Sequence, residues 1–191
     1  MKNIDIVLLP KEKWEGHVLP ISYTTSEYYD FCINKHENGF HISIEKKSLS
    51  QPITHTPEEN DFPDILYAKY FPDAQAYGVL EGEKLVAAIE VFPEDWSNRL
   101  RVTELWVADH LQRKGIGHAL MEKAKEQARK DKRRAIILET QTCNVNAIGF
   151  YLHEGFTFIG CDICCYSNHD IEDKGVRLEL GYFFPDDQTK K

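Results

Sequence analysis

The sequence of 191 residues has no apolar stretch long enough to cross a membrane. Its first apolar run, residues 4–9, is interrupted by Asp5 and closed by Pro10, so it is also too short for the core of a signal peptide. Internal repeats and low-complexity segments are missing too. With 42% hydrophobic and 28% charged residues, the composition excludes membrane, fibrous and wholly disordered proteins. We therefore expect a soluble, cytoplasmic protein without a membrane partner.

The chain also lacks an excess of basic residues. Lysine and arginine number 23 against 31 aspartates and glutamates, for a net charge of −8, which argues against a nucleic-acid partner. Bases gather in one stretch, residues 113–134, which holds nine bases and three acids. This stretch is either an anion-binding region or the solvated face of a helix. The acidic remainder of the chain favours a cationic or neutral second ligand.

Cysteine is scarce, and its count of five is odd, so the sequence does not indicate a disulfide framework. The cluster Cys161, Cys164 and Cys165 resembles half of a zinc site. A second pair with matching spacing is missing from the sequence. We expect free thiols in a strand and no bound metal.

Two segments that differ in composition and in the regularity of their hydrophobic pattern predict the domain organisation. Residues 1–60 form an N-terminal extension, in which strands at 28–33 and 40–44 are joined through Asn38-Gly39 as a β-hairpin. Residues 61–191 form the main domain. Its periodicity predicts a short helix at 61–71, strands at 76–80, 85–92 and 101–107, a helix from 116, a strand at 135–138, a helix at 144–152, and strands at 156–163 and 176–184. This order predicts an α/β (α+β) fold, a mixed sheet with helices packed on it.

A strand–loop–helix junction carries a chemical signal. The strand ends with Leu105-Trp106-Val107, and Gln112-Arg113-Lys114-Gly115-Ile116-Gly117 opens the next helix. Glycine lets a ligand approach the backbone, and successive N–H groups at a helix N-terminus attract an anion such as pyrophosphate. The segment matches neither the P-loop nor G-x-G-x-x-G, and two glycines here are equally explained by a tight turn.

A second motif follows the next strand: Asn144-x-x-Ala147-x-x-Phe150-Tyr151-x-x-x-Gly155-Phe156. Together the two segments resemble the GCN5-related N-acetyltransferase (GNAT) family, whose motifs R/Q-x-x-G-x-G/A and N-x-x-A-x-x-F-Y-x-x-x-G-F both fit without a gap. The resemblance covers about residues 74–184. Within the family, residues 138–141 and 161–180 look most like streptothricin acetyltransferases. The resemblance to the GNAT family implies a GNAT-like mixed, mostly antiparallel sheet with helices on both faces, here with the N-terminal β-hairpin added.

The resemblance implies acetyl-CoA as cosubstrate, lying between the strands that end at Val107 and Gln141, and no metal. The pantetheine arm would contact the first strand and Asn144, the pyrophosphate would lie against residues 112–117, and the amine would attack the thioester directly. The cofactor-binding residues that it implies are Leu105, Trp106, Val107, Gln112, Arg113, Lys114, Gly115, Ile116, Gly117, Asn144 and Tyr151.

The catalytic residues are also implied by the resemblance. Tyr151 holds the family's usual general-acid position, where its phenol protonates the departing CoA thiolate. Packing of Tyr151 beside Phe150 in the core is the alternative. Glu104 is the first candidate for the general base, although streptothricin-type sequences carry this carboxylate at the position of Thr103. Glu139, at the end of an apolar strand, is the second candidate, and its alternative role is a structural hydrogen bond.

We therefore expect an N-acetyltransferase acting on a primary amine of a small, cationic acceptor, such as an antibiotic, a polyamine or lysine. Four acidic residues either line the acceptor site or belong to solvated loops: Asp162, Asp170, Glu172 and Asp173. The alternative function is a non-catalytic acetyl-CoA-binding or partner-binding module of the same fold. A homodimer is compatible with both.

Overall fold

The computed structural model describes residues 4–57 and 63–185, which fall into two compact units. Unit 1 comprises the described residues of 1–21, 57–138 and 182–191. Unit 2 comprises residues 22–56 and 139–181. Residues 22–56 thus group with the C-terminal part of the chain, and the predicted domain boundary at residue 60 stays a prediction.

Unit 1 is built on a mostly antiparallel sheet. Its strands, in sheet order, are β1 (Val7–Leu9), β4 (Gln75–Glu81), β5 (Lys84–Glu94), β6 (Arg99–Val107) and β7 (Ala135–Gln141), whose last residues belong to unit 2. Among the described pairs of these five strands, β6–β7 is parallel and the other three are antiparallel. Residues 85–91 of β5 are all buried, as expected for a central strand covered on both faces. Three short helical turns complete the unit: α1 (Lys11–Trp14), η2 (Asp95–Ser97) and η3 (Asp109–Leu111).

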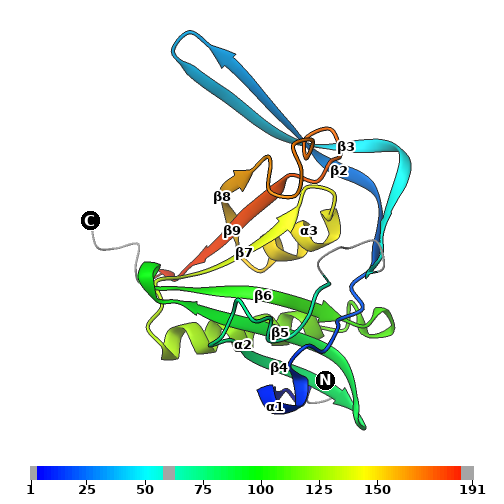
Figure 1. Cartoon of the computed structure of the whole chain (residues 1–191), viewed down its shortest axis with the longest axis vertical. Coiled ribbons are helices and arrows are strands. Elements are labelled where there is room, and N and C mark those ends of the chain that lie inside the picture. The colour runs from blue at the N-terminus through cyan, green and yellow to red at the C-terminus, as the bar shows by residue number, and fades with distance from the viewer. Residues whose placement is uncertain (1–3, 58–62, 186–191) are drawn as a thin grey trace. The chain divides into compact units, whose positions relative to one another are not determined.

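Helix α2 (Ile116–Lys130) packs along β5 and β6, and Figure 1 shows it beside these strands. Its buried residues recur at three- and four-residue spacing, as the sequence predicts. They are Ile116, Leu120, Met121, Ala124, Lys125 and Ala128. The apolar stripe therefore fixes which side of α2 faces the sheet, and with it the position of the helix N-terminus.

The helix predicted at residues 61–71 is wrong over its described part, residues 63–71, which forms turns. Backbone groups there pair with another segment instead of with one another. The Leu66 N–H donates to the His17 carbonyl at 3.0 Å, and the Leu19 N–H donates to the Asp64 carbonyl at 2.8 Å. Tyr67 takes a left-handed conformation with φ of 58°. Leu66 is fully buried, whereas Tyr70 is 70% exposed.

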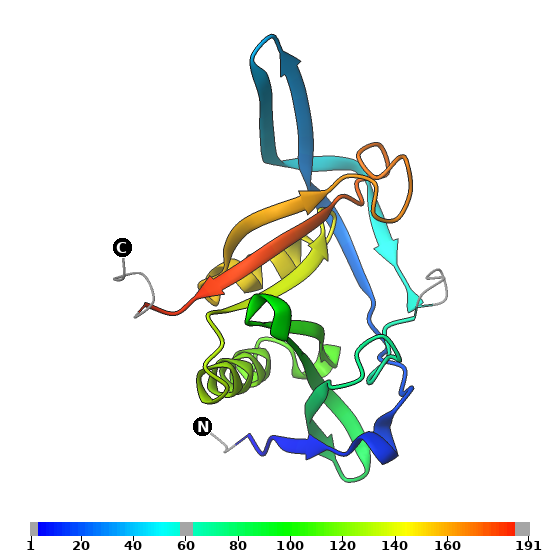
Figure 2. The same ribbon diagram turned by 60° about the vertical axis from the view of Figure 1, so that its left-hand side comes forward.

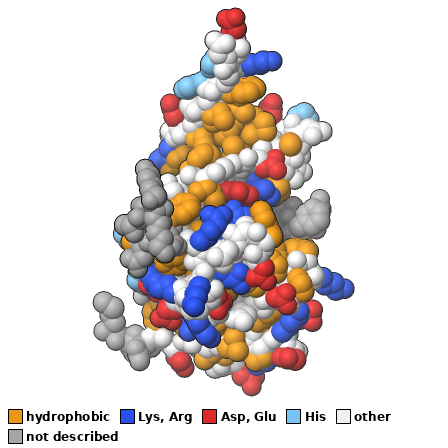
Figure 3. Space-filling model, turned by 90° about the vertical axis from the view of Figure 1, so that its left-hand side faces the viewer, with side chains coloured by type: hydrophobic (Ala, Val, Ile, Leu, Met, Phe, Trp, Pro, Cys, Tyr) orange, Lys and Arg blue, Asp and Glu red, His pale blue; other side chains and the backbone are white. Residues whose placement is uncertain are grey.

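Unit 2 contains the predicted hairpin, with longer strands than expected. Strands β2 (Tyr23–His36) and β3 (Gly39–His55) pair around a two-residue turn. One face of the hairpin is apolar, because Phe31 lies opposite Ile44 and Ile33 lies opposite Ile42. Hydrophobic side chains gather on the hairpin in the space-filling view (Figure 3). Phe31 is buried in the core of the unit, and the apolar face continues outward from there.

Unit 2 also contains α3 (Val145–His153) and the antiparallel pair β8 (Thr157–Asp162) and β9 (Arg177–Phe183), which lie side by side (Figure 2). The last two residues of β9 belong to unit 1. The core of unit 2 joins α3 to the hairpin and to the start of β9, through Phe31, Ile148, Val176 and Leu178. All five cysteines are free, as predicted. Only Cys161 of the clustered three lies in a strand; Cys164 and Cys165 lie in the loop after β8.

Candidate active site

The turn between β6 and α2 presents backbone N–H groups at the start of a 15-residue helix. Residues 112–115 are exposed, and Arg113 (φ 59°) and Gly115 (φ 82°) are left-handed. A Cβ at Gly115 would meet no atom within 4 Å, so its backbone angle, not crowding, calls for glycine. Within residues 4–57 and 63–185, no side chain caps the helix N-terminus. We call residues 112–117 the cradle, because this geometry favours an anion.

Gln112 fastens the cradle to the strand before it. Its side-chain amide donates to the Val107 carbonyl at 3.2 Å and to Asp109 Oδ1 at 3.0 Å. Both hydrogens of that amide are therefore used inside the loop. Gln112 holds the turn in shape, while the exposed Arg113 and Lys114 supply the positive charge.

Strand β6, which leads into the cradle, bends at a β-bulge. Glu104 lies opposite Glu90 and Val102 lies opposite Val91, so Thr103 is the extra residue. Beyond the bulge, Leu105 and Val107 are half-buried and pair with Ile89 and Ala87 of β5. Trp106 packs against the core that contains Trp14, and it lines a pocket of about 600 Å³ in unit 1.

In unit 2, α3 positions the other two residues implied by the family. Asn144 caps the helix, and its Oδ1 accepts from the Ala147 N–H at 3.2 Å. Tyr151 is 9% exposed, with its ring 5.5 Å from that of Phe150 and 6.0 Å from that of Phe156. This aromatic packing limits the positions open to the phenol.

The two candidate bases have different surroundings. Glu104 is half-buried on β6 beside the bulge. Glu139 is exposed on β7, and its carboxylate lies 3.6 Å from an Arg177 nitrogen. Arg177 also approaches Glu179 at 3.2 Å and Asp162 at 3.9 Å. Glu139 is thus one member of a group of carboxylates around a single guanidinium.

Comparison with known proteins identifies the protein family. The model of the acetyltransferase (GNAT) family matches residues 20–156. The chain belongs to this family. Streptothricin acetyltransferase A of Bacillus subtilis (strain 168) is 30% identical over 132 residues, covering 69% of this chain and 74% of that protein. Streptothricin acetyltransferase of Escherichia coli is 29% identical over 136 residues, covering 71% of this chain and 72% of that protein.

A solved structure of a Bacillus anthracis str. Ames protein in complex with acetyl coenzyme A has the same fold as this GNAT protein. It superposes with a TM-score of 0.69 at 20% identity, covering 94% of this chain and 96% of that one. The family, the mixed fold with its hairpin, and the looser likeness to streptothricin acetyltransferases are confirmed. The chain is an N-acetyltransferase.

One buried carboxylate of this GNAT protein is missing from the sequence-based site. Glu90 of β5 is 0% exposed and accepts from the Tyr67 N–H at 2.5 Å and from the Thr103 hydroxyl at 2.8 Å. Burial raises the pKa of Glu90 above its ordinary value. A single acid within the apolar run 85–92 is the signal that could have found it. Glu90 joins the left-handed Tyr67 to the bulge of β6 and so supports the strand that carries the cradle.

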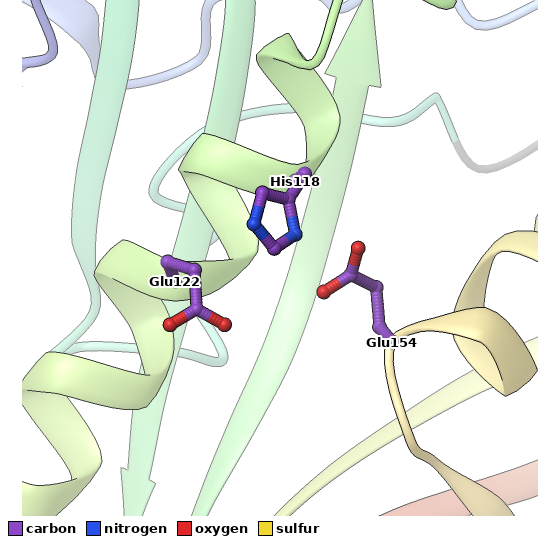
Figure 4. A group of neighbouring side chains, drawn as sticks. All are labelled: His118, Glu122 and Glu154. Atoms are coloured by element: carbon purple, nitrogen blue, oxygen red, sulfur yellow. The ribbon is translucent and has the colours of Figure 1, made fainter.

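Figure 4 shows three further polar side chains, of which His118 and Glu122 project from α2 one turn apart and Glu154 follows α3. A hydrogen bond from Lys125 lowers the pKa of Glu122. The expectation of a reaction without metal stays a prediction. No helix within residues 4–57 and 63–185 combines the length and apolar character needed to cross a membrane.

Proposed function

We propose that this chain transfers the acetyl group of acetyl-CoA to a primary amine of a streptothricin-like antibiotic. The observation that carries the proposal is the similarity to two streptothricin acetyltransferases over about 70% of the chain. The acetyl-CoA complex of a protein with the same fold supports the cosubstrate. The cradle supports it independently, because it offers N–H groups and exposed bases to a pyrophosphate.

In this proposal the cradle grips the cosubstrate mainly through its backbone. Residues 115–117 direct N–H groups at the pyrophosphate, and the helix dipole adds attraction. Arg113 and Lys114 neutralise phosphate charge from the exposed turn. The backbone of Leu105, Trp106 and Val107 follows the pantetheine arm. Asn144 contacts the arm with the atoms that its helix cap leaves open.

The chemistry is a direct attack of the amine nitrogen on the thioester carbonyl. A carbon–nitrogen bond forms, the carbon–sulfur bond breaks, and CoA leaves as a thiolate. A backbone N–H near Val107 stabilises the oxyanion that forms in between. Tyr151 donates its phenolic proton to the thiolate. A phenol has a reference pKa of about 10 and a thiol of about 8.5, so the transfer depends on close positioning.

The acceptor amine must lose a proton before it attacks. Glu104 is the proposed base, directly or through water, because it lies on the strand that leads to Val107. The ion pair between Glu139 and Arg177 argues against Glu139, since the guanidinium competes with an incoming ammonium for the same carboxylate. A homodimer, the absence of nucleic-acid and membrane partners, and a cytoplasmic location remain further predictions.

The test is CoA release from acetyl-CoA with a panel of amines: streptothricin, aminoglycosides, polyamines, free amino acids and a lysine peptide. We expect saturable release with streptothricin and the highest kcat/KM for that acceptor. If CoA were released only with another cationic amine, the chain would still be an acetyltransferase, but its acceptor would differ from the one proposed. Acetyl-CoA binding without release from any amine would instead favour the non-catalytic module.

A further inference from the structure

A second concave region lies within unit 2, apart from the residues proposed above for acetyl transfer. It is a pocket of about 270 Å³ at the base of the hairpin, and we call it the hairpin-base pocket. Its walls come from the two hairpin ends, from the end of β7 with the following turn, and from the loop between β8 and β9. The lining residues used below are Tyr23, His55, Gln141, Cys143, Tyr166 and Asp173.

Aromatic rings line this pocket from both the hairpin and the loop between β8 and β9. The rings of Tyr23 and His55 stack at 5.2 Å with an interplanar angle of 25°. The Tyr23 hydroxyl donates to Gln141 Oε1 at 3.2 Å, which fastens the hairpin to the end of β7. Tyr166 adds another phenol from the loop, and partial burial raises its pKa, so it stays neutral. Faces of such rings attract cations.

Two of the described lining residues, Asp170 and Asp173, carry carboxylates that have different roles. Asp170 is 2% exposed and holds the loop in shape, since it accepts from the backbone N–H groups of Tyr166 and Ser167 at 3.0 and 2.8 Å. Asp173 is exposed, and its carboxylate has no hydrogen bond or ion pair within the part of the chain that the structure describes. Among the described residues that line the pocket, none is a lysine or an arginine. The pocket therefore combines the exposed carboxylate of Asp173 with aromatic rings.

We propose that the hairpin-base pocket holds a cationic group of the acceptor other than the amine that becomes acetylated. A carboxylate stabilises the protonated form of a neighbouring amine, whereas the attacking amine must be neutral. Neither Asn144 nor Tyr151 lines the pocket, although Gln141 and Cys143 do and come just before Asn144 in the chain. Part of the pocket wall is therefore adjacent in sequence to the proposed cofactor residue Asn144. The acceptor class is an amine with at least one additional cationic group.

This inference rests on the proposed function, and its test uses the intact chain with streptothricin as acceptor. Asp173→Asn removes the charge and keeps the size of the side chain. Glu172→Gln is the matched control, because Glu172 is exposed, adjacent and absent from the lining. We expect Asp173→Asn to raise the KM for streptothricin at least tenfold and to leave the KM for acetyl-CoA unchanged. Glu172→Gln should leave both constants within twofold of the wild type.

The pH dependence of kcat separates the two possible positions of Asp173. If it holds a second cationic group, the pH profile of kcat is the same in Asp173→Asn and in the wild type. A shifted profile would mean that Asp173 contacts the reacting amine, and it would overturn the inference. Equal KM values in Asp173→Asn and Glu172→Gln would overturn it too. Failure of the proposed function is distinct, because the wild type would then release no CoA with streptothricin.

A second pair of variants tests whether the aromatic ring of Tyr166 contacts the cationic group. Tyr166 is 52% exposed, so its replacement leaves the core intact. Tyr166→Phe keeps the ring and should leave the KM for streptothricin within twofold. Tyr166→Leu removes the ring and should raise this KM about fivefold, in line with the weak attraction of a cation to an exposed ring. The same KM in both variants would exclude a contact between the ring and the cation.

Discussion

The cradle and the hairpin-base pocket are built in opposite ways. The cradle is six consecutive residues, 112–117, and its chemistry comes from backbone N–H groups and two left-handed residues. The pocket draws on segments more than a hundred residues apart, and its chemistry comes from side chains. A backbone site changes when the course of the chain changes. A side-chain site changes with single substitutions that leave the fold intact. We therefore expect differences in acceptor preference to arise from substitutions in the pocket.

Tyr151→Phe distinguishes the chemical step from the binding of both substrates, because Tyr151 belongs neither to the cradle nor to the hairpin-base pocket. We expect kcat to fall about 10²- to 10³-fold with every acceptor, since the departing thiolate loses its proton donor. The Kd for acetyl-CoA and the KM for streptothricin should stay within twofold. Stopped assays of CoA release and calorimetry of acetyl-CoA binding measure these values. Wild-type turnover in this variant would return Tyr151 to a packing role beside Phe150.

Gly115→Ala tests whether the cradle acts through its backbone. At φ of 82° an L-residue costs about 1–2 kcal/mol, so the turn should shift and weaken acetyl-CoA binding about tenfold. The KM for streptothricin should not change. Gly16→Ala is the matched control, because Gly16 has φ of 76°, equally open space, and a place outside the cradle. An equal loss of acetyl-CoA affinity in both variants would show a general effect of strain.

Glu90→Gln tests how far the buried Glu90 stabilises β6, the strand before the cradle. No comparable role is assigned to the carboxylates of the hairpin-base pocket. The folded-state pKa of Glu90 is raised by burial, so its contribution to stability is complete below the unfolded pKa and is lost as pH rises through the folded value. Wild-type stability should therefore decline by about 1 kcal/mol per pH unit across that range. Glu90→Gln, which mimics the protonated acid, should flatten the decline. Urea unfolding between pH 5 and 8 measures it, with the exposed Glu83→Gln as control.

Alkylation of cysteine gives the smallest expected effect and concerns the pocket alone, since the cradle contains no cysteine. Cys143 is buried in the pocket wall, and burial raises the pKa of its thiol, so it should react more slowly than the exposed Cys32. Saturating streptothricin should slow the labelling of Cys143 a further two- to threefold and leave Cys32 unchanged. Mass spectrometry after iodoacetamide treatment at pH 8 follows both sites. Equal protection of both thiols would place the acceptor elsewhere.

Local patterns predicted most of the fold and the contiguous part of the site. The apolar stripe of α2, the capping Asn144 and the two glycines of the cradle each depend on neighbours a few residues away. The short helix predicted at 61–71 is wrong over residues 63–71, because backbone groups there pair with residues 16–19, which no local pattern reveals. The left-handed Tyr67 and its bond to Glu90 belong to the same long-range arrangement.

The hairpin-base pocket also depends on long-range contacts that local sequence patterns do not reveal. Four acidic residues were candidates for the acceptor site, and the sequence could not rank them. The structure gives them different partners: Asp162 approaches Arg177, Asp170 shapes its own loop, and Glu172 is exposed outside the pocket. Asp173 lines the pocket with its carboxylate open. Their ranking depends on a hairpin more than a hundred residues earlier, which supplies Tyr23 and His55.

The hydrogen bond between Tyr23 and Gln141 spans 118 residues, which has a consequence for the order in which the protein is made. During synthesis the hairpin is complete long before β7 and the loop with Asp173 leave the ribosome. The cradle needs only its own short stretch of chain and the strands just before it. A nascent chain can therefore complete the cradle before the ribosome has made the pocket residues from Gln141 onward.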